Sequence, residues 1–159
     1  MIKVKRIDHV AIAVADRDGA VLQMRDLFGL CAGAIEHVVD QQTDVAFLSA
    51  DSDTTAHALA LEIIAPASAP GGDDAGNIGN IGNIGLTRFL HKRGPGLHHI
   101  CFEVEDLPAA LASLKAAGVR LIDEAPRPGA RGHMVAFIHP ASTGGVLFEL
   151  CATRNGAQA

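Results

Sequence analysis

Four residues have the types and spacing of a metal site. His9 and His99 lie in similar strand-like segments, and Glu62 and Glu149 each interrupt an otherwise apolar run. The separation from histidine to glutamate is 53 positions in the first pair and 50 in the second. A buried carboxylate normally shifts its pKa, pairs with a cation or binds a metal. Two imidazoles and two carboxylates suit Zn, Co, Ni, Mn or Fe, with water completing the coordination shell.

The elements that must position these residues occur twice along the chain. Residues 6–14 predict a strand, and the following helix is capped by Asp16 and ends at Gly29. Residues 97–104 predict the equivalent strand, and a second helix begins at Asp106 and ends at Gly118. Three more strands are expected after each helix, over residues 34–39, 45–49 and 57–65 in the first half and 119–122, 133–139 and 145–152 in the second.

Each half therefore reads β-α-β-β-β, which predicts an α+β fold with mostly antiparallel sheets. The two repeats, about 5–67 and 95–152, would form a single domain over residues 1–159. The glycine- and asparagine-rich segment 67–85 would join them as a flexible loop with no chemical role.

Alternation along the strands predicts which side chains share a face. His9 lies on the face of Ala11 and Ala13, opposite a core face that carries Val10, Ile12 and Val14. In the second repeat, His99 shares its face with Cys101, and His98 points to the other side. Small neighbours beside each histidine leave room for a ligand. The remaining histidines, which have no counterpart in the other repeat, are expected in surface or loop roles: His37, His57, His91, His133 and His139.

Composition excludes several classes of protein. The chain has 159 residues, a net charge of −5 and 48% hydrophobic residues, which describes one globular domain and disfavours a nucleic-acid partner. No segment is apolar enough to span a membrane, and the N-terminal segment lacks the apolar core of a signal peptide, so a cytoplasmic location is expected. Cys31, Cys101 and Cys151 are expected to be buried free thiols.

Three segments resemble the methylmalonyl-CoA epimerases, within the vicinal oxygen chelate superfamily that also contains glyoxalase I. They are IDHVAIAV at residues 7–14, KRGPGLHHICFEVEDL at 92–107 and VRLIDEAPRPGARGHMVAFIHPASTGGVLFEL at 119–150. The resemblance covers most of the chain, and its most specific parts are the GPGLHH element and the ending HP-x-ST-GGV-x-x-E. It implies that the two repeats form a curved, mostly antiparallel sheet around a metal-binding cavity.

The resemblance also implies a ligand set. His9, His99 and Glu149 match the family's metal ligands, and Glu62 stands at the remaining ligand position, where such relatives tend to have Gln. Some relatives carry a further glutamate on the third strand as an acid or base. That position is Val45 here, so Glu62 is expected to replace the missing carboxylate, with Asp44 and Asp40 the nearest other acids.

The activity that the resemblance implies is epimerisation of methylmalonyl-CoA at carbon 2, by proton removal through an enolate that a divalent ion stabilises. The ion would be Co, Mn, Ni, Zn or Mg, with Glu62 and Glu149 as base and acid. Ser142 and Thr143 would contact the substrate carboxylate, or simply form a turn. The chain would act as a homodimer. Four cations could meet the coenzyme A phosphates or be solvated surface charge: Lys92, Arg93, Arg127 and Arg131.

Three other activities stay open at this point. A glyoxalase I-type lyase that acts on a glutathione hemithioacetal would have a similar ligand set. An Fe(II) dioxygenase would use two histidines and one carboxylate. A metal-free protein of the bleomycin-resistance kind is disfavoured, because it has no need of the buried His and Glu residues.

Overall fold

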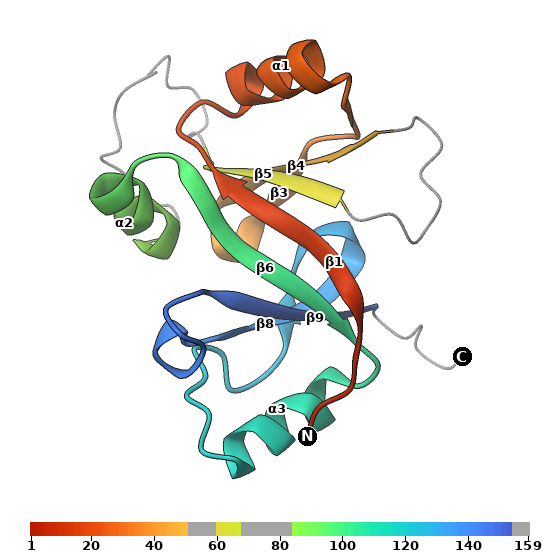
Figure 1. Cartoon of the computed structure of the whole chain (residues 1–159), viewed down its shortest axis with the longest axis vertical. Helices are drawn as coiled ribbons and strands as arrows, with labels where there is room; N and C mark the ends of the chain where they lie inside the picture. The colour runs from red at the N-terminus through yellow and green to blue at the C-terminus, as the bar shows by residue number, and fades with distance from the viewer. Residues whose placement is uncertain (51–59, 68–83, 154–159) are drawn as a thin grey trace. The chain divides into compact units, whose positions relative to one another are not determined.

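A computed structural model describes residues 1–50, 60–67 and 84–153 (Figure 1). Its contacts group the chain into two compact units, unit 1 (residues 1–10 and 99–159) and unit 2 (residues 11–98). Two long strands, β1 (Val4–Ala13) and β6 (Gly96–Val104), each contribute residues to both units.

Unit 2 contains two helices, α1 (Arg17–Phe28) and α2 (Ile84–Arg93). Its strands are β2 (Cys31–Ala32), β3 (Glu36–Val38), β4 (Thr43–Ser49) and β5 (Ala60–Pro66), with a short 3-10 turn at Val39–Gln41. The order β2-β4-β5-β1 runs across this sheet, and β3 also pairs with β4. The strand pairs of β4 with β2, β3 and β5 are all antiparallel.

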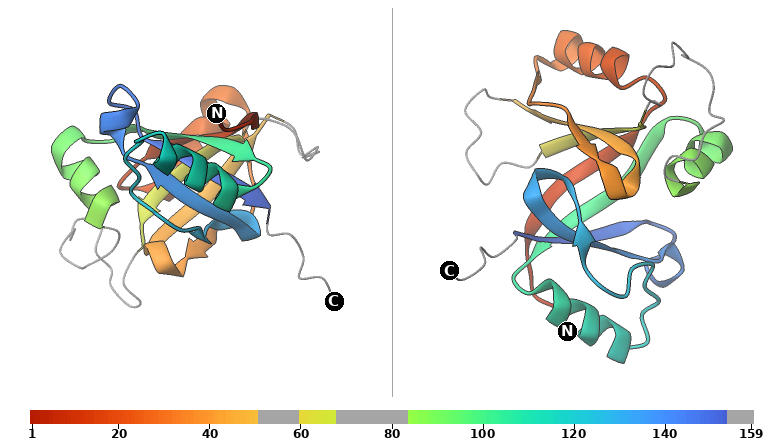
Figure 2. Two further views of the ribbon diagram at one scale, coloured as in Figure 1. Left: turned by 90° about the horizontal axis from the view of Figure 1, so that it is seen from below. Right: turned by 180° about the vertical axis from the view of Figure 1, so that it is seen from behind.

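Unit 1 contains α3 (Leu107–Ala116), β7 (Arg127–Pro128), β8 (His133–Ile138) and β9 (Phe148–Thr153). Two 3-10 turns, Ala130–Gly132 and Pro140–Ser142, flank β8. The sheet order is β1-β6-β9-β8-β7. β6 and β9 are parallel, whereas β8 is antiparallel to β9 and to β7. Helix α3 covers one face of β8 and β9, as the views in Figure 2 show.

The predicted helix boundaries are confirmed. The Asp16 carboxylate accepts a hydrogen bond from the Gly19 amide at 2.9 Å, and Asp106 caps α3 in the same way. Gly29 closes α1 at a φ of 70°, a left-handed conformation that glycine adopts without steric cost.

The two units use the same strand register. Phe47 on β4 lies opposite Glu62 on β5, and Phe137 on β8 lies opposite Glu149 on β9. Equivalent pairs of apolar residues flank them and face a helix in each unit, which supports the internal repeat. The cores built on these positions are Ala46, Leu48, Ile63 and Ala65 in unit 2, and Ala136, Ile138, Leu150 and Ala152 in unit 1.

Some predictions were wrong. Residues 119–122 do not form a strand; Leu121 makes an isolated bridge to Ile138, and the edge strand is instead the two-residue β7. Helix α2 was not predicted, and it includes residues 84 and 85 of the proposed loop. The rest of that loop lies outside the described residues, apart from residue 67. Cys31 is exposed rather than buried, because β2 lies at the edge of its sheet.

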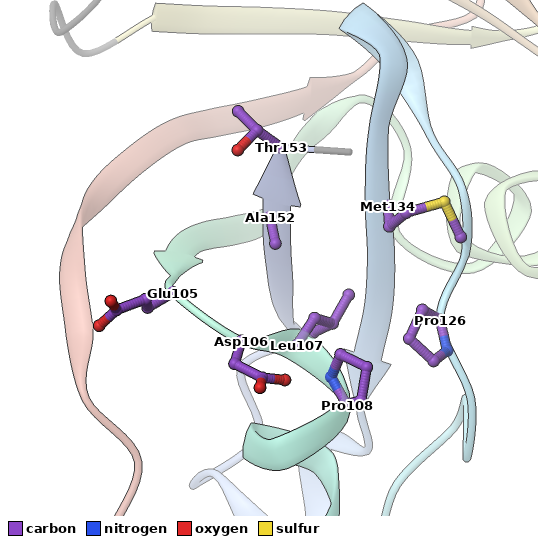
Figure 3. A pocket seen from close by; sticks show the side chains of 8 residues that line it. All are labelled: Glu105, Asp106, Leu107, Pro108, Pro126, Met134, Ala152 and Thr153. Atoms are coloured by element: carbon purple, nitrogen blue, oxygen red, sulfur yellow. The ribbon is translucent and has the colours of Figure 1, made fainter. Parts of the chain in front are cut away.

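A hollow of about 660 Å³ opens at the start of α3 (Figure 3). Ala152 and Met134 line it from the helix-covered face of the sheet, with Glu105 and Asp106 at its other side. Glu149 alternates with Leu150 and Ala152 along β9, so its side chain leaves the opposite face of the strand. This hollow is therefore separate from the candidate metal ligands.

Within the described parts of the chain, no helix combines the length and the apolar character needed to cross a membrane.

Candidate metal centre

Three of the predicted ligands converge in unit 1. The Nε2 atoms of His9 and His99 are 3.2 Å apart. The Oε2 atom of Glu149 lies 3.1 Å from the first nitrogen and 3.2 Å from the second. All three side chains are buried. Two nitrogens and one oxygen thus form a nearly equilateral triangle of donor atoms.

The three side chains of this triangle come from adjacent strands. His9 comes from β1, His99 from its neighbour β6, and Glu149 from β9, which pairs with β6 on its other side. Glu149 lies opposite Cys101, two residues after His99 and on the same face. Parallel pairing of β6 and β9 therefore places the Glu149 carboxylate near the His99 imidazole, displaced by two residues along the strand.

Asp8 fixes the orientation of the His9 ring. Its Oδ2 atom is 2.9 Å from His9 Nδ1. A carboxylate at that distance accepts the Nδ1 proton, which leaves the Nε2 lone pair facing the triangle. Asp8 and His9 are consecutive on β1 and both are buried, so the strand is covered on both faces at this point. Their side chains nevertheless contact each other.

Two arginines hold Asp8 as an anion. Arg6 Nη2 lies 2.5 Å from Asp8 Oδ1, and Arg131 Nη2 contacts Asp8 Oδ2. Burial opposes ionisation, but the hydrogen bond from His9 and the nearby Arg131 and Arg6 charges outweigh it and lower the pKa of Asp8 to about 2. Arg131 has a φ of 54°, an uncommon conformation for a residue with a side chain.

The Glu149 carboxylate is also kept ionised. Complete burial would raise its pKa, but the facing His99 and His9 imidazoles act more strongly, so the pKa of Glu149 lies well below its usual range. The triangle therefore contains one charged carboxylate oxygen beside two imidazole nitrogens.

The donor set fits a divalent ion. Ligands about 2.1 Å from a metal are roughly 3.0 Å apart at right angles and roughly 3.4 Å apart in a tetrahedron. The observed donor separations of 3.1–3.2 Å fall between those values. The orientation of His9 by Asp8 is the arrangement that a ligating histidine requires. A divalent metal is thus compatible with this site, and the donor types do not select one element.

Phe137 braces the second histidine. Its ring meets the His99 ring edge-on, with centroids 5.2 Å apart, and the Arg127 guanidinium lies 5.2 Å from the Phe137 centroid on β8. Arg127 also pairs with Asp123 at 3.2 Å. These contacts restrict rotation of the His99 imidazole and hold Arg127 beside the site with 30% of its side chain exposed.

Glu62 belongs to unit 2, where it lies on β5 and is buried. Antiparallel pairing of β4 and β5 puts Glu62 on the same sheet face as Phe47 and Val45. Val45 stands where some relatives are expected to carry a further acid. Asp44 points to the opposite face and is bound by Arg17 at 3.1 Å and His37 at 2.8 Å. Of these two carboxylates, Glu62 alone shares the face of Val45.

The predicted substrate contacts lie in less buried places. Arg93 ends α2, is exposed and lies 5.9 Å from the Phe89 ring centroid in unit 2. Thr143 donates its hydroxyl to the Val146 carbonyl at 2.5 Å, and the Ser142 hydroxyl accepts from the Arg120 amide at 2.9 Å. Both hydroxyls thus stabilise the turn before β9, and their contact with a substrate stays a prediction.

Sequence reasoning missed the residues around the triangle. Asp8 was not considered as a site residue, and Arg131 was considered as a phosphate ligand or as solvated surface charge. An acid directly before a candidate ligand histidine was the available signal for Asp8. No local pattern pointed to Phe137, whose role depends on pairing between strands distant in sequence.

Comparison with known proteins fits this arrangement. Residues 8–137 match the profile of the Glyoxalase/Bleomycin resistance protein/Dioxygenase superfamily. The chain belongs to this superfamily. Its α+β architecture, with the repeated strand register described above, is the fold of that superfamily.

Several members of the superfamily are similar over nearly their whole length. The ethylmalonyl-CoA/methylmalonyl-CoA epimerase of Cereibacter sphaeroides is 36% identical over 147 residues, covering 91% of this chain and 96% of that protein. The methylmalonyl-CoA epimerase of Mycobacterium tuberculosis has a solved structure with 33% identity and a TM-score of 0.77, over 94% and 89% of the two chains. A variant of the Streptomyces coelicolor epimerase, in complex with 2-nitronate-propionyl-CoA, gives a TM-score of 0.79 at 29% identity, over 96% and 97%.

Proposed function

We propose that this chain is a metal-dependent epimerase that interconverts the (R) and (S) forms of methylmalonyl-CoA at carbon 2. The observation that carries the proposal is the convergence of His9, His99 and Glu149 on one point, in a chain that is 36% identical to a named epimerase. The substrate class is taken from the relatives. One is named as an ethylmalonyl-CoA/methylmalonyl-CoA epimerase, and another was solved in complex with an acyl-CoA compound.

His9, His99 and Glu149 would hold a divalent ion, with Glu62 as a fourth ligand; Co, Mn, Ni, Zn and Mg are all candidates. When bound, the ion would supply a Lewis acid for the negative charge that develops on the thioester oxygen. Asp8 keeps the Nε2 lone pair of His9 directed at the site, and Phe137 keeps the His99 ring in place.

Epimerisation needs one group to remove the carbon-2 proton and another to return a proton from the other side. Glu62 is assigned as the base, because it is buried on the face that Val45 leaves without an acid. Glu149 is the second carboxylate, and the imidazoles beside it keep it ionised. A carboxylate that binds a metal is a weaker base than a free one, and this reduction applies to both Glu62 and Glu149 in the proposed ligand set.

Coenzyme A brings phosphates that need cations. Arg127 and Arg93 are proposed to bind them, since both guanidinium groups are partly accessible and each lies near an aromatic ring. Ser142 and Thr143, in the turn before β9, would contact the substrate carboxylate. A homodimer and a role in propionate metabolism in the cytoplasm complete the proposal.

The experiment that tests the base is Glu62→Gln, which keeps the side-chain volume and one metal-binding oxygen. Carbon-2 exchange should fall by about 10²- to 10⁴-fold, the usual contribution of a positioned general base, while metal content is largely retained. Asp44→Asn is the matched control, since Asp44 is bound by Arg17 and His37 on the opposite face of β4, and it should leave exchange within a few-fold. Near wild-type exchange in Glu62→Gln would reject Glu62 as the base.

The same assays separate the alternative activities. A glyoxalase I-type lyase would bind metal and turn over a glutathione hemithioacetal, without exchange at carbon 2 of methylmalonyl-CoA. A metal-free binding protein would bind no divalent ion tightly and would catalyse neither reaction.

A further inference from the structure

A second group of atoms that could bind a metal lies in unit 1, on β1, β8 and β9. A carboxylate oxygen of Asp8, a ring nitrogen of His133 and the thiol of Cys151 all lie within 4.8 Å of one another. Asp8 and Cys151 are fully buried, and His133 is half-buried at the start of β8. The proposed epimerisation uses neither His133 nor Cys151.

Cys101 adds a fourth donor. Asp8 is shared with another group of possible ligands, which contains Cys101. Cys101 Sγ is also within 4.8 Å of donor atoms of Asp8 and His9. The two groups share Asp8, and Asp8, Cys101, His133 and Cys151 are together called here the thiol cluster, beside the His9–His99–Glu149 triangle.

Strand pairing explains how four distant residues meet. Cys101 follows His99 by two positions on β6, and Cys151 follows Glu149 by two positions on β9, so both thiols leave the face that carries the triangle. Cys151 lies opposite Val135 on β8. His133 is two residues before Val135, so its side chain leaves the same face of β8.

The fold itself does not require these residues. In unit 2, the register places Ala11 where unit 1 has Cys101, Ile64 where it has Cys151, and Thr43 where it has His133. Those positions in unit 2 are buried and offer neither a thiol nor an imidazole. The donors are thus a property of one repeat, as expected for a site and not for a packing requirement of the strands.

From this geometry we infer that the thiol cluster is a second metal site, selective for a soft or borderline divalent cation such as Zn²⁺. Cys, His and Asp are the ligand types that zinc takes in proteins, and zinc binds four of them in a tetrahedron. Donors about 2.0–2.3 Å from zinc are roughly 3.3–3.8 Å apart. The donor atoms of Asp8, His133 and Cys151, which all lie within 4.8 Å of one another, therefore need only small side-chain rotations to close on an ion, and Cys101, which lies within 4.8 Å of Asp8, is the fourth ligand.

Charge and access are compatible with binding. Each thiol that binds releases one proton, and the two thiolates and the Asp8 carboxylate leave an excess of one negative charge around a dication. Arg131, which contacts Asp8, offsets that excess. The Arg131 side chain is 32% exposed and His133 is half-buried, so an ion can approach from this side.

The inference does not depend on the proposed epimerase activity, because its readout is thiolate coordination. Co²⁺ is the probe: bound to thiolate, it gives an intense ultraviolet charge-transfer band, which imidazole and carboxylate ligands alone do not produce. Titration of the reduced, metal-free protein with Co²⁺ should produce this band, together with release of protons. The band should persist in His99→Ala, which disables the triangle, and Zn²⁺ should displace it.

Cys151→Ser should abolish the band, whereas Cys31→Ser, which removes the exposed thiol, should keep it. If Cys151→Ser does not fold, His133→Ala serves instead; it retains both thiols and should weaken Co²⁺ binding at least tenfold. No band in the wild-type protein, a band lost in Cys31→Ser, or one lost in His99→Ala would each overturn the inference. The last result would assign the thiols to the triangle.

Discussion

Replacing Asp8 with Asn should weaken metal binding at the His9–His99–Glu149 triangle without removing any of its three ligands. Asp8 accepts the Nδ1 proton of His9, so its charge favours the tautomer whose Nε2 lone pair faces the site. Asparagine has nearly the same size but is neutral, and its amide can turn either its oxygen or its NH₂ group toward His9.

The contacts of Asp8 set the expected magnitude. Loss of an outer carboxylate partner of a ligating histidine typically costs 10- to 100-fold in metal affinity. Asp8 is also the charged partner of Arg6 and Arg131. Hydrogen bonds to charged groups contribute about 1.5–3 kcal/mol each, and these two guanidinium groups are partly screened by water, so the free energy of unfolding should fall by about 2 kcal/mol in total.

The assay is Mn²⁺ titration followed by the electron paramagnetic resonance signal of the free ion, because a hard ion does not favour the thiol cluster. Glu103→Gln is the matched control. It removes another buried carboxylate, bonded to Arg6 at 2.6 Å and to Lys5, but leaves the Asp8–His9 contact intact. Asp8→Asn should lower Mn²⁺ affinity, and Glu103→Gln should not. Unchanged affinity in Asp8→Asn, with the fold retained, would refute the orienting role of Asp8.

Three more predictions follow from single contacts. The hydrogen bond from Lys5 lowers the pKa of Glu103 below its ordinary 4.5, so its contribution to stability is present above that pH and lost as the pH falls through the folded-state pKa; Glu103→Gln should flatten this part of an acid-unfolding curve. Phe137→Leu removes the ring beside His99 and should cost about 1 kcal/mol of stability in chemical denaturation and several-fold in Mn²⁺ affinity. Gly29 has a φ of 70°, so Gly29→Ala should lower the free energy of unfolding by about 1 kcal/mol in the same denaturation assay. In Gly33→Ala the added Cβ would lie 3.8 Å from its nearest neighbour, and the free energy of unfolding should change by less than about 0.5 kcal/mol.

Local patterns predicted the elements that have strong end signals. Asp16 and Asp106 cap their helices as expected, since a carboxylate at that position satisfies a free amide of the first turn. Helix α2 was missed because its start adjoins the asparagine- and glycine-rich segment, which was interpreted as a loop. The region 119–122 has strand-forming residues, but its pairing with residues 137–139 is limited to an isolated bridge at Leu121 and single backbone hydrogen bonds to Phe137 and His139, so no strand forms.

The repeat made the convergence of three side chains predictable. Equivalent spacing singled out His9, Glu62, His99 and Glu149, and the donor atoms of His9, His99 and Glu149 lie 3.1–3.2 Å apart. Their role as metal ligands stays a prediction. The surrounding contacts were not predictable in the same way. Strand alternation does not predict the contact between the consecutive residues Asp8 and His9. The thiol cluster depends on the pairing of β6, β8 and β9, which follows from topology and not from neighbouring residues in sequence.

The central claim is that a divalent ion at the triangle supports proton exchange at carbon 2 of methylmalonyl-CoA. The most direct measurement is deuterium incorporation at that carbon in heavy water, followed by nuclear magnetic resonance, with metal-free and metal-reloaded samples of the same protein. Exchange should be lost on metal removal, return on reloading, and stay absent in His99→Ala under the same reloading. Exchange at an undiminished rate in the metal-free protein, or no exchange in the fully loaded protein, would contradict the account.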